Sequence, residues 1–452
     1  MTRPLTQPPE QARPAALSPG RVIARWPADQ PLVAARRPTD GSWLFGSSRL
    51  TLRVTGPASS PSIAWLDPAT GQPTPAPIES TADPFKALDS AVRRFSTGQG
   101  CWIGSMSYDL AGLCEPKALT GPGPSCAEPN CAEPSWPLAE FHRCDDLWIL
   151  NAAGHLRAVG SPPPLNENPP PAPPLNLQFS SELGRAGYAA LVRRTLALIR
   201  AGDIYEANIA HRLIAQHRSN PRAIAAVLLD AAGPAHGAYL ELAGVRARAI
   251  ASASPESFLH FDAARRTLRT RPMKGTRLAA EGARAELEAS PKERAELHMI
   301  TDLMRNDLGR VCEMGSVRVV HDRLIEPHAS GSLLQASSLV EGTLRPELSL
   351  AEALSSLLPA GSITGAPKVR AMQVIRELEG YSRGPWCGCC ALLEDSGEAH
   401  LSVAIRTALI DGSRVVYPVG AGIVADSEPE AEWDETLAKA SVLLAMGTVV
   451  ER

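Results

Sequence analysis

Residues 401–423 have the sequence LSVAIRTALIDGSRVVYPVGAGI, and their pattern is the starting point for the fold class. The apolar and β-branched runs Leu401–Ile410 and Ser413–Val419 predict two strands. Further strands are expected at Ile204–Ile214, Ala238–Leu242 and Ala249–Ala253, and helices at about 184–201, 291–306, 350–357, 366–379 and 429–446. Because strands and helices do not alternate regularly, we expect an α+β fold with large, mostly antiparallel sheets flanked by helices.

A proline-rich segment divides the chain. Residues 161–174 contain eight prolines, which suits a stiff extended segment and excludes a helix or a central strand there. Short strand-like runs precede it at Trp43–Phe45, Leu50–Val54, Trp102–Tyr108 and Leu147–Leu150. We therefore expect a disordered lead-in at residues 1–20, an amino-terminal subdomain at 21–160, a linker at 161–178 and the main domain at 179–452.

The composition excludes several classes of protein. With 45 basic and 48 acidic side chains the net charge is −3, which argues against a nucleic-acid-binding surface. No apolar run approaches the roughly 18–20 residues of a membrane-spanning helix, and the first residues lack the pattern of a signal peptide. Nine cysteines are too few for a disulfide scaffold. We expect a cytoplasmic protein with reduced thiols.

Two predicted helices begin in a similar way. Residues 290–293 (SPKE) form a capping-box pattern with proline at the first helical position, and residues 427–430 (SEPE) have serine and glutamate at the same spacing. Each start is followed by two glutamates three residues apart, Glu293 with Glu296 and Glu432 with Glu435, so both members of a pair share a helix face. Two such faces opposite each other would suit Mg²⁺. The alternative is that Glu293 only caps its helix and Glu435 pairs with a lysine on a wet surface.

Glycine-containing segments and one arginine indicate anion binding. Pro359–Lys368 leads into a helix, so its amides could face a carboxylate, although its sequence is not that of a P-loop. Gly420 and Gly422 follow a predicted strand and would let the backbone approach a ligand, with an ordinary turn as the alternative. Arg406 falls inside a strand pattern, where its guanidinium needs a carboxylate from a substrate or from the protein.

Lys274 is unusual because only six of the 45 basic residues are lysines. It lies between Arg271 and Arg277, whose charge, if close in space, would lower the lysine pKa and make its amine a nucleophile. The alternative is a surface lysine in a turn.

Taken together, these segments resemble the chorismate-utilising enzyme family, which includes anthranilate synthase component I, isochorismate and salicylate synthases, and aminodeoxychorismate synthase component I. The resemblance covers roughly residues 180–452 and implies the fold of anthranilate synthase component I. Its segments, in family order, are Gly202–Asn208, Ser254–Phe258, Arg271–Arg277, Glu296–Cys312, Gly361–Arg370, Ala404–Thr407 and Gly420–Lys439. Seven segments in order are far more specific than any single motif.

The resemblance implies a role for each candidate residue. Glu296 and Glu435 would bind Mg²⁺, with Glu293 and Glu432 supporting the ion through water. The substrate carboxylates and ring would be held by Arg406, Lys439, the amides of Gly420 and Gly422, and Thr364. Glu256 would be the general acid that protonates the departing ring hydroxyl.

Lys274 separates the branches of the family. Members that make aminodeoxychorismate carry lysine at this position, whereas anthranilate and isochorismate synthases usually have a small residue. The implied chemistry is covalent: the amine adds to the diene as the hydroxyl leaves, and ammonia then displaces the amine. Gln335 stands where anthranilate synthases have a histidine linked to pyruvate elimination, and a neutral amide transfers protons poorly. Glu206 and Trp386 also depart from the family's usual glutamine and tyrosine.

The implied activity is the conversion of chorismate and ammonia to 4-amino-4-deoxychorismate, on the route to p-aminobenzoate and folate. Ammonia would come from glutamine through a separate glutaminase subunit in a heterodimer, because the chain shows no cysteine-centred amidotransferase module. Two alternatives remain open. One is anthranilate synthase component I, and the other is a catalytically weak subunit that activates the glutaminase.

Overall fold

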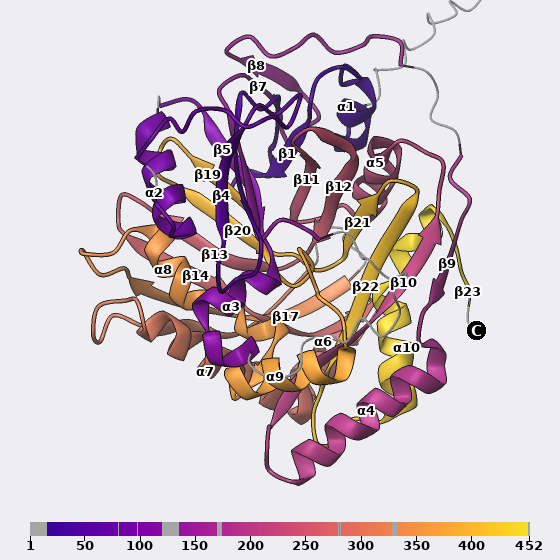
Figure 1. Cartoon of the computed structure of the whole chain (residues 1–452). Coiled ribbons are helices and arrows are strands. Elements are labelled where there is room, and N and C mark those ends of the chain that lie inside the picture. The colour runs from indigo at the N-terminus through magenta and orange to yellow at the C-terminus, as the bar shows by residue number, and fades with distance from the viewer. Residues whose placement is uncertain are drawn as a thin grey trace, which may run out of the picture.

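The computed structural model describes residues 16–79, 81–96, 98–119, 135–169, 174–278, 280, 282–327 and 333–450. Two large sheets pack against each other, and helices cover their outer sides (Figure 1). Every strand pair in the two sheets is antiparallel except β23 with β9 at one edge. The predicted α+β fold with mostly antiparallel sheets is confirmed.

The first sheet has 12 strands and contains segments from both ends of the chain. In spatial order its strands are β23 (Gly447–Val450), β9 (Leu177–Ser181), β10 (Glu206–Gln216), β22 (Arg414–Ile423), β21 (Thr407–Asp411), β12 (Val245–Ser254), β11 (His236–Leu242), β1 (Val33–Arg36), β2 (Trp43–Gly46), β7 (Leu147–Leu150) and β8 (Leu156–Val159), with β18 (Gly365–Ala366) paired to β10.

The second sheet has 11 strands. In spatial order they are β15 (Met273–Leu278), β17 (Leu333–Thr343), β14 (Thr267–Arg271), β13 (Ser257–Asp262), β20 (Ala399–Val403), β19 (Cys389–Glu394), β5 (Cys101–Met106), β6 (Ala139–Cys144), β3 (Leu50–Thr55) and β4 (Ser62–Leu66), with β16 (Arg318–Pro327) paired to β17.

The outer face of the first sheet is covered by two groups of helices. Helices α1 and α5 pack over one part of it, and α4, α9 and α10 pack over β10 and β22.

The helices are α1 (Pro19–Arg25), α2 (Pro84–Phe95), α3 (Ala111–Cys114), α4 (Gly184–Arg200), α5 (Pro221–Ala232), α6 (Ala283–Ala289), α7 (Pro291–Gly309), α8 (Leu350–Leu357), α9 (Lys368–Glu379) and α10 (Pro429–Lys439), with short 3-10 turns at Tyr108–Leu110, Pro116–Leu119, Gly361–Ile363 and Ser441–Ala445. The core between the sheets takes side chains from both, such as Ile250 and Leu401.

The stretch expected as one strand at Leu401–Ile410 is two strands in different sheets. β20 belongs to the second sheet and β21 to the first, and the chain crosses between them at residues 404–406. Arg406 has a φ of +50° at this crossing, so the prediction that it lies inside a strand is wrong. The error has a physical cause. Both strands are buried, so the apolar pattern continues through the crossing and does not reveal the change of sheet.

The last predicted helix is also shorter than expected. α10 ends at Lys439, and a 3-10 turn follows at Ser441–Ala445. Trp433 in α10 packs with α4 and α9, whereas Leu443 in the turn packs into the core over β9 and β10. The segment 429–446 therefore contributes to two cores and is not one continuous helix.

The two parts of the chain on either side of the proline-rich segment share both sheets. β1 pairs with β11 in the first sheet, and β5 pairs with β19 in the second. The segment itself contacts the part before it, because Trp148 Nε1 donates to the Pro163 carbonyl at 2.9 Å. Of the expected lead-in, residues 1–15 lie outside the described residues, and α1 already begins at Pro19.

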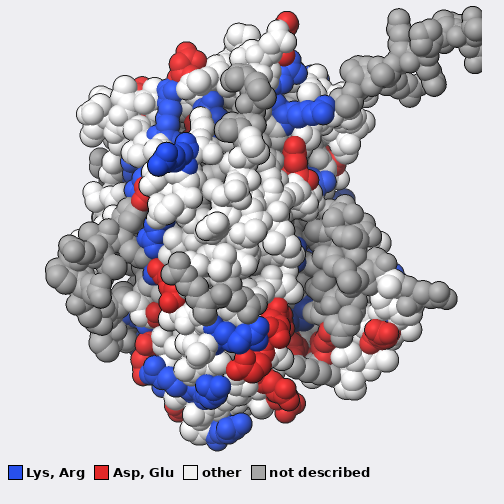
Figure 2. All heavy atoms as spheres, turned by 90° about the vertical axis from the view of Figure 1, so that its right-hand side faces the viewer, with Lys and Arg blue, Asp and Glu red and all other residues white. Residues whose placement is uncertain are grey.

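Surface charge is mixed on the face shown in Figure 2. Acidic and basic side chains gather in its lower part, below a largely uncharged central area. None of the helices in the described part of the chain has the length and apolar character needed to cross a bilayer.

Candidate active site

Lys274 lies where the edge of the second sheet meets the first sheet and α7. Its Nζ is 2.9 Å from Glu206 Oε1 on β10 and 3.6 Å from Glu296 Oε2 on α7. The side chain of Lys274 is only 18 % exposed and that of Glu206 only 3 %, so the alternative of a surface lysine in a turn is wrong. A buried ion pair with this short contact fixes the position of the amine.

The electrostatic environment of Lys274 is the opposite of the one expected. Burial alone would lower the lysine pKa, but the carboxylates of Glu206, Glu296 and Glu435 outweigh it and raise the pKa well above its ordinary value. Arg271 does not act on the amine, because its side chain contacts Ser337 and Glu326. The side chain of Arg277 lies outside the described part. The arginine-rich local sequence was misleading because the charges that reach the amine come from other elements.

Gly275 allows α6 and α7 to pack closely against Lys274's strand. Its φ is +86°, and a Cβ placed there would lie 2.9 Å from Leu287 Cδ1 and 3.1 Å from Glu293 Oε2. The pairing of β15 with β17 also shifts register between Met273 and Thr276. This irregularity spans Lys274, consistent with a bulge that aims a functional side chain.

Gly420 and Gly422 lie within β22, not in a turn after it. They pair with Ala210 and Asn208 on β10, so the interpretation as an ordinary turn is wrong. A Cβ on Gly422 would lie 2.5 Å from Glu206 Oε1 and 2.7 Å from Lys274 Nζ. A residue without a side chain is therefore required at this position for the Glu206–Lys274 pair to form.

Glu256 follows β12 and is 6 % exposed. Burial raises its pKa to about 7, against the opposite effects of a hydrogen bond to Ser362 and the charges of Lys274 and Lys439. A carboxyl group with this pKa holds a proton at neutral pH in a large fraction of molecules. It can therefore act as a general acid.

The two carboxylate pairs lie on the first two turns of α7 and α10. Ser290 caps α7 by accepting from the Glu293 N–H at 3.4 Å, as expected. The second predicted cap is wrong: Glu428 is the N-cap of α10 without a side-chain cap, and Ser427 instead accepts from the Val424 N–H at 3.1 Å. Ser427, which precedes α10, thus stabilises the loop before the helix, and a spacing pattern does not distinguish this role from a cap.

Glu296 and Glu435 come from different helices but act on the same ammonium group, that of Lys274. Glu435 also pairs with Lys439 at 2.7 Å, one helical turn away, as the alternative of a wet surface pair predicted. The Glu435 side chain is 54 % exposed and that of Lys439 is 39 % exposed. Lys439 Nζ in addition donates to the Gly420 carbonyl at 2.9 Å, so this pair faces the site. The donor set of hard carboxylate oxygens fits Mg²⁺, which takes one or two protein carboxylates together with water.

Arg406 lies at the crossing between β20 and β21, close to Tyr417. Burial lowers the pKa of Arg406 and raises that of the Tyr417 phenol. Within the described residues Arg406 forms no ion pair with a carboxylate, and Tyr417 Oη is buried without a hydrogen-bond partner. The guanidinium therefore does not have the structural acid that the sequence left open as its partner.

Thr364 is fully buried beside β10, and its hydroxyl donates to the carbonyls of Gly361 at 3.0 Å and Ala360 at 3.3 Å. Its own carbonyl accepts from Asn208 N–H at 2.8 Å, which joins the 361–364 turn to β10.

Lys368, on the following helix, is held by Asp307 Oδ2 at 2.5 Å. Lys368 therefore anchors α9 to α7.

Sequence reasoning missed two residues of this site. Glu206 was noticed only as a departure from a usual glutamine, yet it is the residue nearest to the lysine amine. Ser362 was part of the glycine-containing segment without a role of its own, and it contacts Glu256. Glu206 gave no distinct signal of its own, because the strand that carries it also contains Asn208, His211 and Arg212.

Known proteins similar to this chain point to one family. The family described as "chorismate binding enzyme" matches residues 61–445. The chain belongs to the chorismate-binding enzyme family. The match includes Glu206, Glu256, Lys274, Arg406 and both carboxylate pairs.

Relatives of this chorismate-binding chain have two different names. It is 39 % identical over 272 residues to anthranilate synthase component 1 3 of Haloarcula marismortui, covering 59 % of this chain and 53 % of that protein. It is equally 39 % identical over 276 residues to aminodeoxychorismate synthase component 1 of Klebsiella aerogenes, covering 60 % of each chain. These alignments span a little over half the length of the relatives.

A solved structure resembles the whole described fold. Anthranilate synthase component I from Streptococcus pneumoniae superposes with a TM-score of 0.73 at 25 % identity, covering 96 % of this chain and 99 % of that one. The fold implied by the resemblance is confirmed.

Proposed function

We propose that this chain is the chorismate-converting component of an aminodeoxychorismate synthase. The reaction would join chorismate and ammonia to give 4-amino-4-deoxychorismate, the precursor from which p-aminobenzoate and then folate are made. The observation that carries the proposal is the buried amine of Lys274, held 2.9 Å from Glu206 Oε1 within the carboxylate cluster.

The position of this amine supports covalent catalysis. Lys274 Nζ would add to the far end of the substrate diene while the ring C–O bond breaks and Glu256 gives its proton to the departing oxygen, so that water leaves. Ammonia would then add at the carbon that lost the hydroxyl, and the lysine amine would leave as the diene is restored. The amine reacts only after losing its ammonium proton, and Glu206 Oε1 is the acceptor already within hydrogen-bond distance.

The substrate's carboxylates would be held by positive groups around this amine. Arg406 is suited to this role because its guanidinium has no carboxylate partner in the described part of the chain. Lys439 and the backbone at Gly420 and Gly422 would form a second contact, and Thr364 would lie near the ring.

A magnesium ion would be held by Glu296 and Glu435, supported by Glu293 and Glu432. When bound, Mg²⁺ supplies positive charge that fixes a substrate carboxylate against a cluster of like-charged glutamates. Glu296 is itself close to the lysine amine, since its Oε2 is 3.6 Å from Lys274 Nζ.

Ammonia would come from a separate glutaminase subunit that pairs with this chain. The sequence of this chain provides the chorismate site and no recognised cysteine-centred amidotransferase module. The seven cysteines that the structure describes as free include Cys101, Cys389 and Cys390, all buried. Burial raises the pKa of each of these thiols, which makes them unsuited to nucleophilic attack.

Anthranilate synthase component I is the competing function, because relatives at equal identity carry either name. Two residues favour the aminodeoxychorismate branch. Lys274 occupies the site centre, and Gln335, which is 8 % exposed on β17 opposite Thr276, offers a neutral amide where aromatisation would need a proton-transfer group.

A catalytically weak subunit that only activates a glutaminase is less well supported. Glu206 contacts the lysine amine directly. Trp386 is buried and stacks under the Arg383 guanidinium at 4.9 Å, so this replacement serves packing. Both departures from the family pattern thus have places in an intact site.

Replacing the lysine tests the proposal. We expect Lys274→Ala to lose about 100-fold or more in the rate of 4-amino-4-deoxychorismate formation from chorismate, ammonium and Mg²⁺, a loss of roughly 2.7 kcal/mol in transition-state stabilisation. The matched control is Lys86→Ala on α2, an exposed lysine that should keep the wild-type rate. Full activity of Lys274→Ala would refute the nucleophile role.

A further inference from the structure

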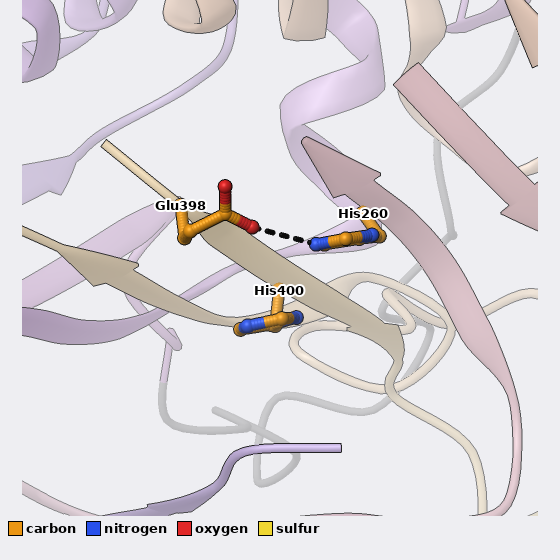
Figure 3. Close-up of side chains that lie close together, drawn as sticks. All are labelled: His260, Glu398 and His400. Carbon is orange, nitrogen blue, oxygen red and sulfur yellow. Dashed lines mark hydrogen bonds and ion pairs between the residues drawn. The ribbon is translucent and has the colours of Figure 1, made fainter. Parts of the chain in front are cut away.

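Two histidines lie directly opposite each other on neighbouring strands of the second sheet. His260 on β13 is paired with His400 on β20, and cross-strand partners of this kind have their Cβ atoms about 4.5–5.5 Å apart on one face. Their imidazole rings are parallel, with an interplanar angle of 3° and a centroid distance of 4.8 Å (Figure 3). The sheet itself therefore brings two nitrogen ligands together.

A carboxylate completes the group. Glu398, two residues before His400, places Oε2 2.9 Å from His260 Nε2, as drawn in Figure 3. One ligand atom from each of the three side chains lies within 4.8 Å of the others. Within the described residues this is the only set of three histidine, cysteine or acidic side chains that meets this spacing.

The group has the supporting contacts that metal sites use. Glu398 Oε1 accepts from the Ala263 N–H at 3.3 Å, which orients the carboxylate. His400 Nε2 lies 3.6 Å from Glu394 Oε1, and Arg37 in turn holds Glu394 with contacts of 2.9 and 2.6 Å. A carboxylate behind a ligating imidazole fixes its tautomer and ring orientation.

We propose that His260, His400 and Glu398 bind a divalent transition-metal ion of the zinc type. Two imidazole nitrogens and one carboxylate oxygen are the ligands of three-residue zinc sites, with water in the fourth position. Two ligands on tetrahedral zinc lie about 3.4 Å apart at metal–ligand distances of about 2.1 Å. The 2.9 Å contact is shorter than that separation by about 0.5 Å, and the other separations, at most 4.8 Å, exceed it by up to about 1.4 Å. Small side-chain rotations would bring the three ligand atoms onto one ion.

This site differs in chemistry from the carboxylates around Lys274. Nitrogen donors suit zinc, copper and nickel, whereas the all-oxygen set of Glu296 and Glu435 suits magnesium. His260 and Glu398 are partly accessible, with side-chain exposures of 22 % and 32 %, whereas His400 is buried at 7 %. An ion can therefore reach them from solvent, and neither proposal depends on the other.

An ion here would join two strands that lead to the chorismate site. β13 begins immediately after Glu256, and β20 ends three residues before Arg406. Binding to the folded state only would raise the thermal stability of the chain. It would do so by linking the elements that carry the general acid and the substrate arginine.

The proposal is tested by titration calorimetry. Zn²⁺ is titrated into the full-length, metal-free protein in the presence of excess Mg²⁺. We expect His260→Asn and His400→Asn each to bind one equivalent fewer than wild type, or to bind it on the order of 100-fold more weakly. The matched control is His298→Asn, because His298 forms a 3.1 Å pair with Asp322 on the surface without a second histidine. Its binding should equal that of wild type.

Equal zinc stoichiometry and affinity in wild type, His260→Asn and His400→Asn would overturn the proposal. A second readout does not require the variants to fold: zinc-edge X-ray absorption of the wild-type protein loaded with one equivalent should show nitrogen and oxygen ligands with two imidazoles. A ligand shell containing sulfur, or one of oxygen alone, would equally overturn it.

Discussion

At the scale of single residues, the environment of each charged group decides its chemistry more than its neighbours in sequence do. Glu256 is buried, and its pKa of about 7 follows from burial working against Lys274 and Lys439. Lys274 is also buried, but three carboxylates raise its pKa. One site thus holds an ammonium group together with a carboxyl group that keeps its proton in a large fraction of molecules at neutral pH.

The Glu256 pKa predicts how the rate depends on pH. A general acid must be protonated, and this carboxyl loses its proton as the pH rises through about 7, so we expect activity with ammonia, at fixed concentration of free NH₃, to fall above that pH. Glu256→Gln should lose about 10²–10⁴-fold in kcat and lose the falling limb of the profile. A pH profile of Glu256→Gln with the wild-type limb would show that another group is the acid.

Gly422 predicts a loss of activity without a loss of fold. In Gly422→Ala the new methyl would lie 2.5 Å from Glu206 Oε1 and 2.7 Å from Lys274 Nζ, both flexible ends that can move away. We expect stability to change little and kcat to fall about 100-fold, because displacement of a reacting group by about 1 Å has that cost. Gly309→Ala, where a Cβ would meet nothing within 4 Å, is the control. Equal kinetics of the two variants would contradict the close approach.

At the scale of elements, α9 and β10 are joined through one buried ion pair. Arg383 and Glu379 are each 1 % exposed, with contacts of 2.6 and 2.9 Å between them. Arg383 also donates to the carbonyls of Ile363 at 3.1 Å and Asn208 at 2.6 Å, and Glu379 accepts from the Ala210 N–H at 2.9 Å. This network sets the position of the 361–364 turn relative to the strand that carries Glu206.

Breaking this pair should be costly. Arg383→Leu leaves the Glu379 carboxylate buried without its cation, and we expect the free energy of unfolding to fall by about 3–5 kcal/mol. The control is Arg305→Ala, whose pair with Asp302 is 50 % and 75 % exposed and should contribute about 0–1 kcal/mol. Urea unfolding of both variants makes the comparison, and similar losses would mean that the Arg383 network does not hold these elements together.

Elements were predicted well where periodicity is local and poorly where the chain changes partner. The expected helix at 184–201 is α4, Gly184–Arg200, because its apolar stripe faces one core throughout. The expected strand at Leu401–Ile410 divides between two sheets, since burial of both halves hides the crossing at Arg406.

At the scale of the whole molecule, the site is assembled from both sheets and two helices. Glu206 and Lys274 are 68 residues apart and belong to different sheets, so no local spacing could show their 2.9 Å contact. The carboxylate pairs were found from sequence because three-residue spacing on a helix is local. The charge around Lys274 was predicted with the wrong sign because it depends on how the two sheets meet.

The central claim concerns the product that this molecule makes from chorismate. The most direct measurement is product analysis after incubation of the isolated chain with chorismate, Mg²⁺ and ammonium, beside a matched incubation with glutamine in place of ammonium. We expect 4-amino-4-deoxychorismate with ammonium and no amination with glutamine until a glutaminase subunit is added. Anthranilate as the main product would contradict it.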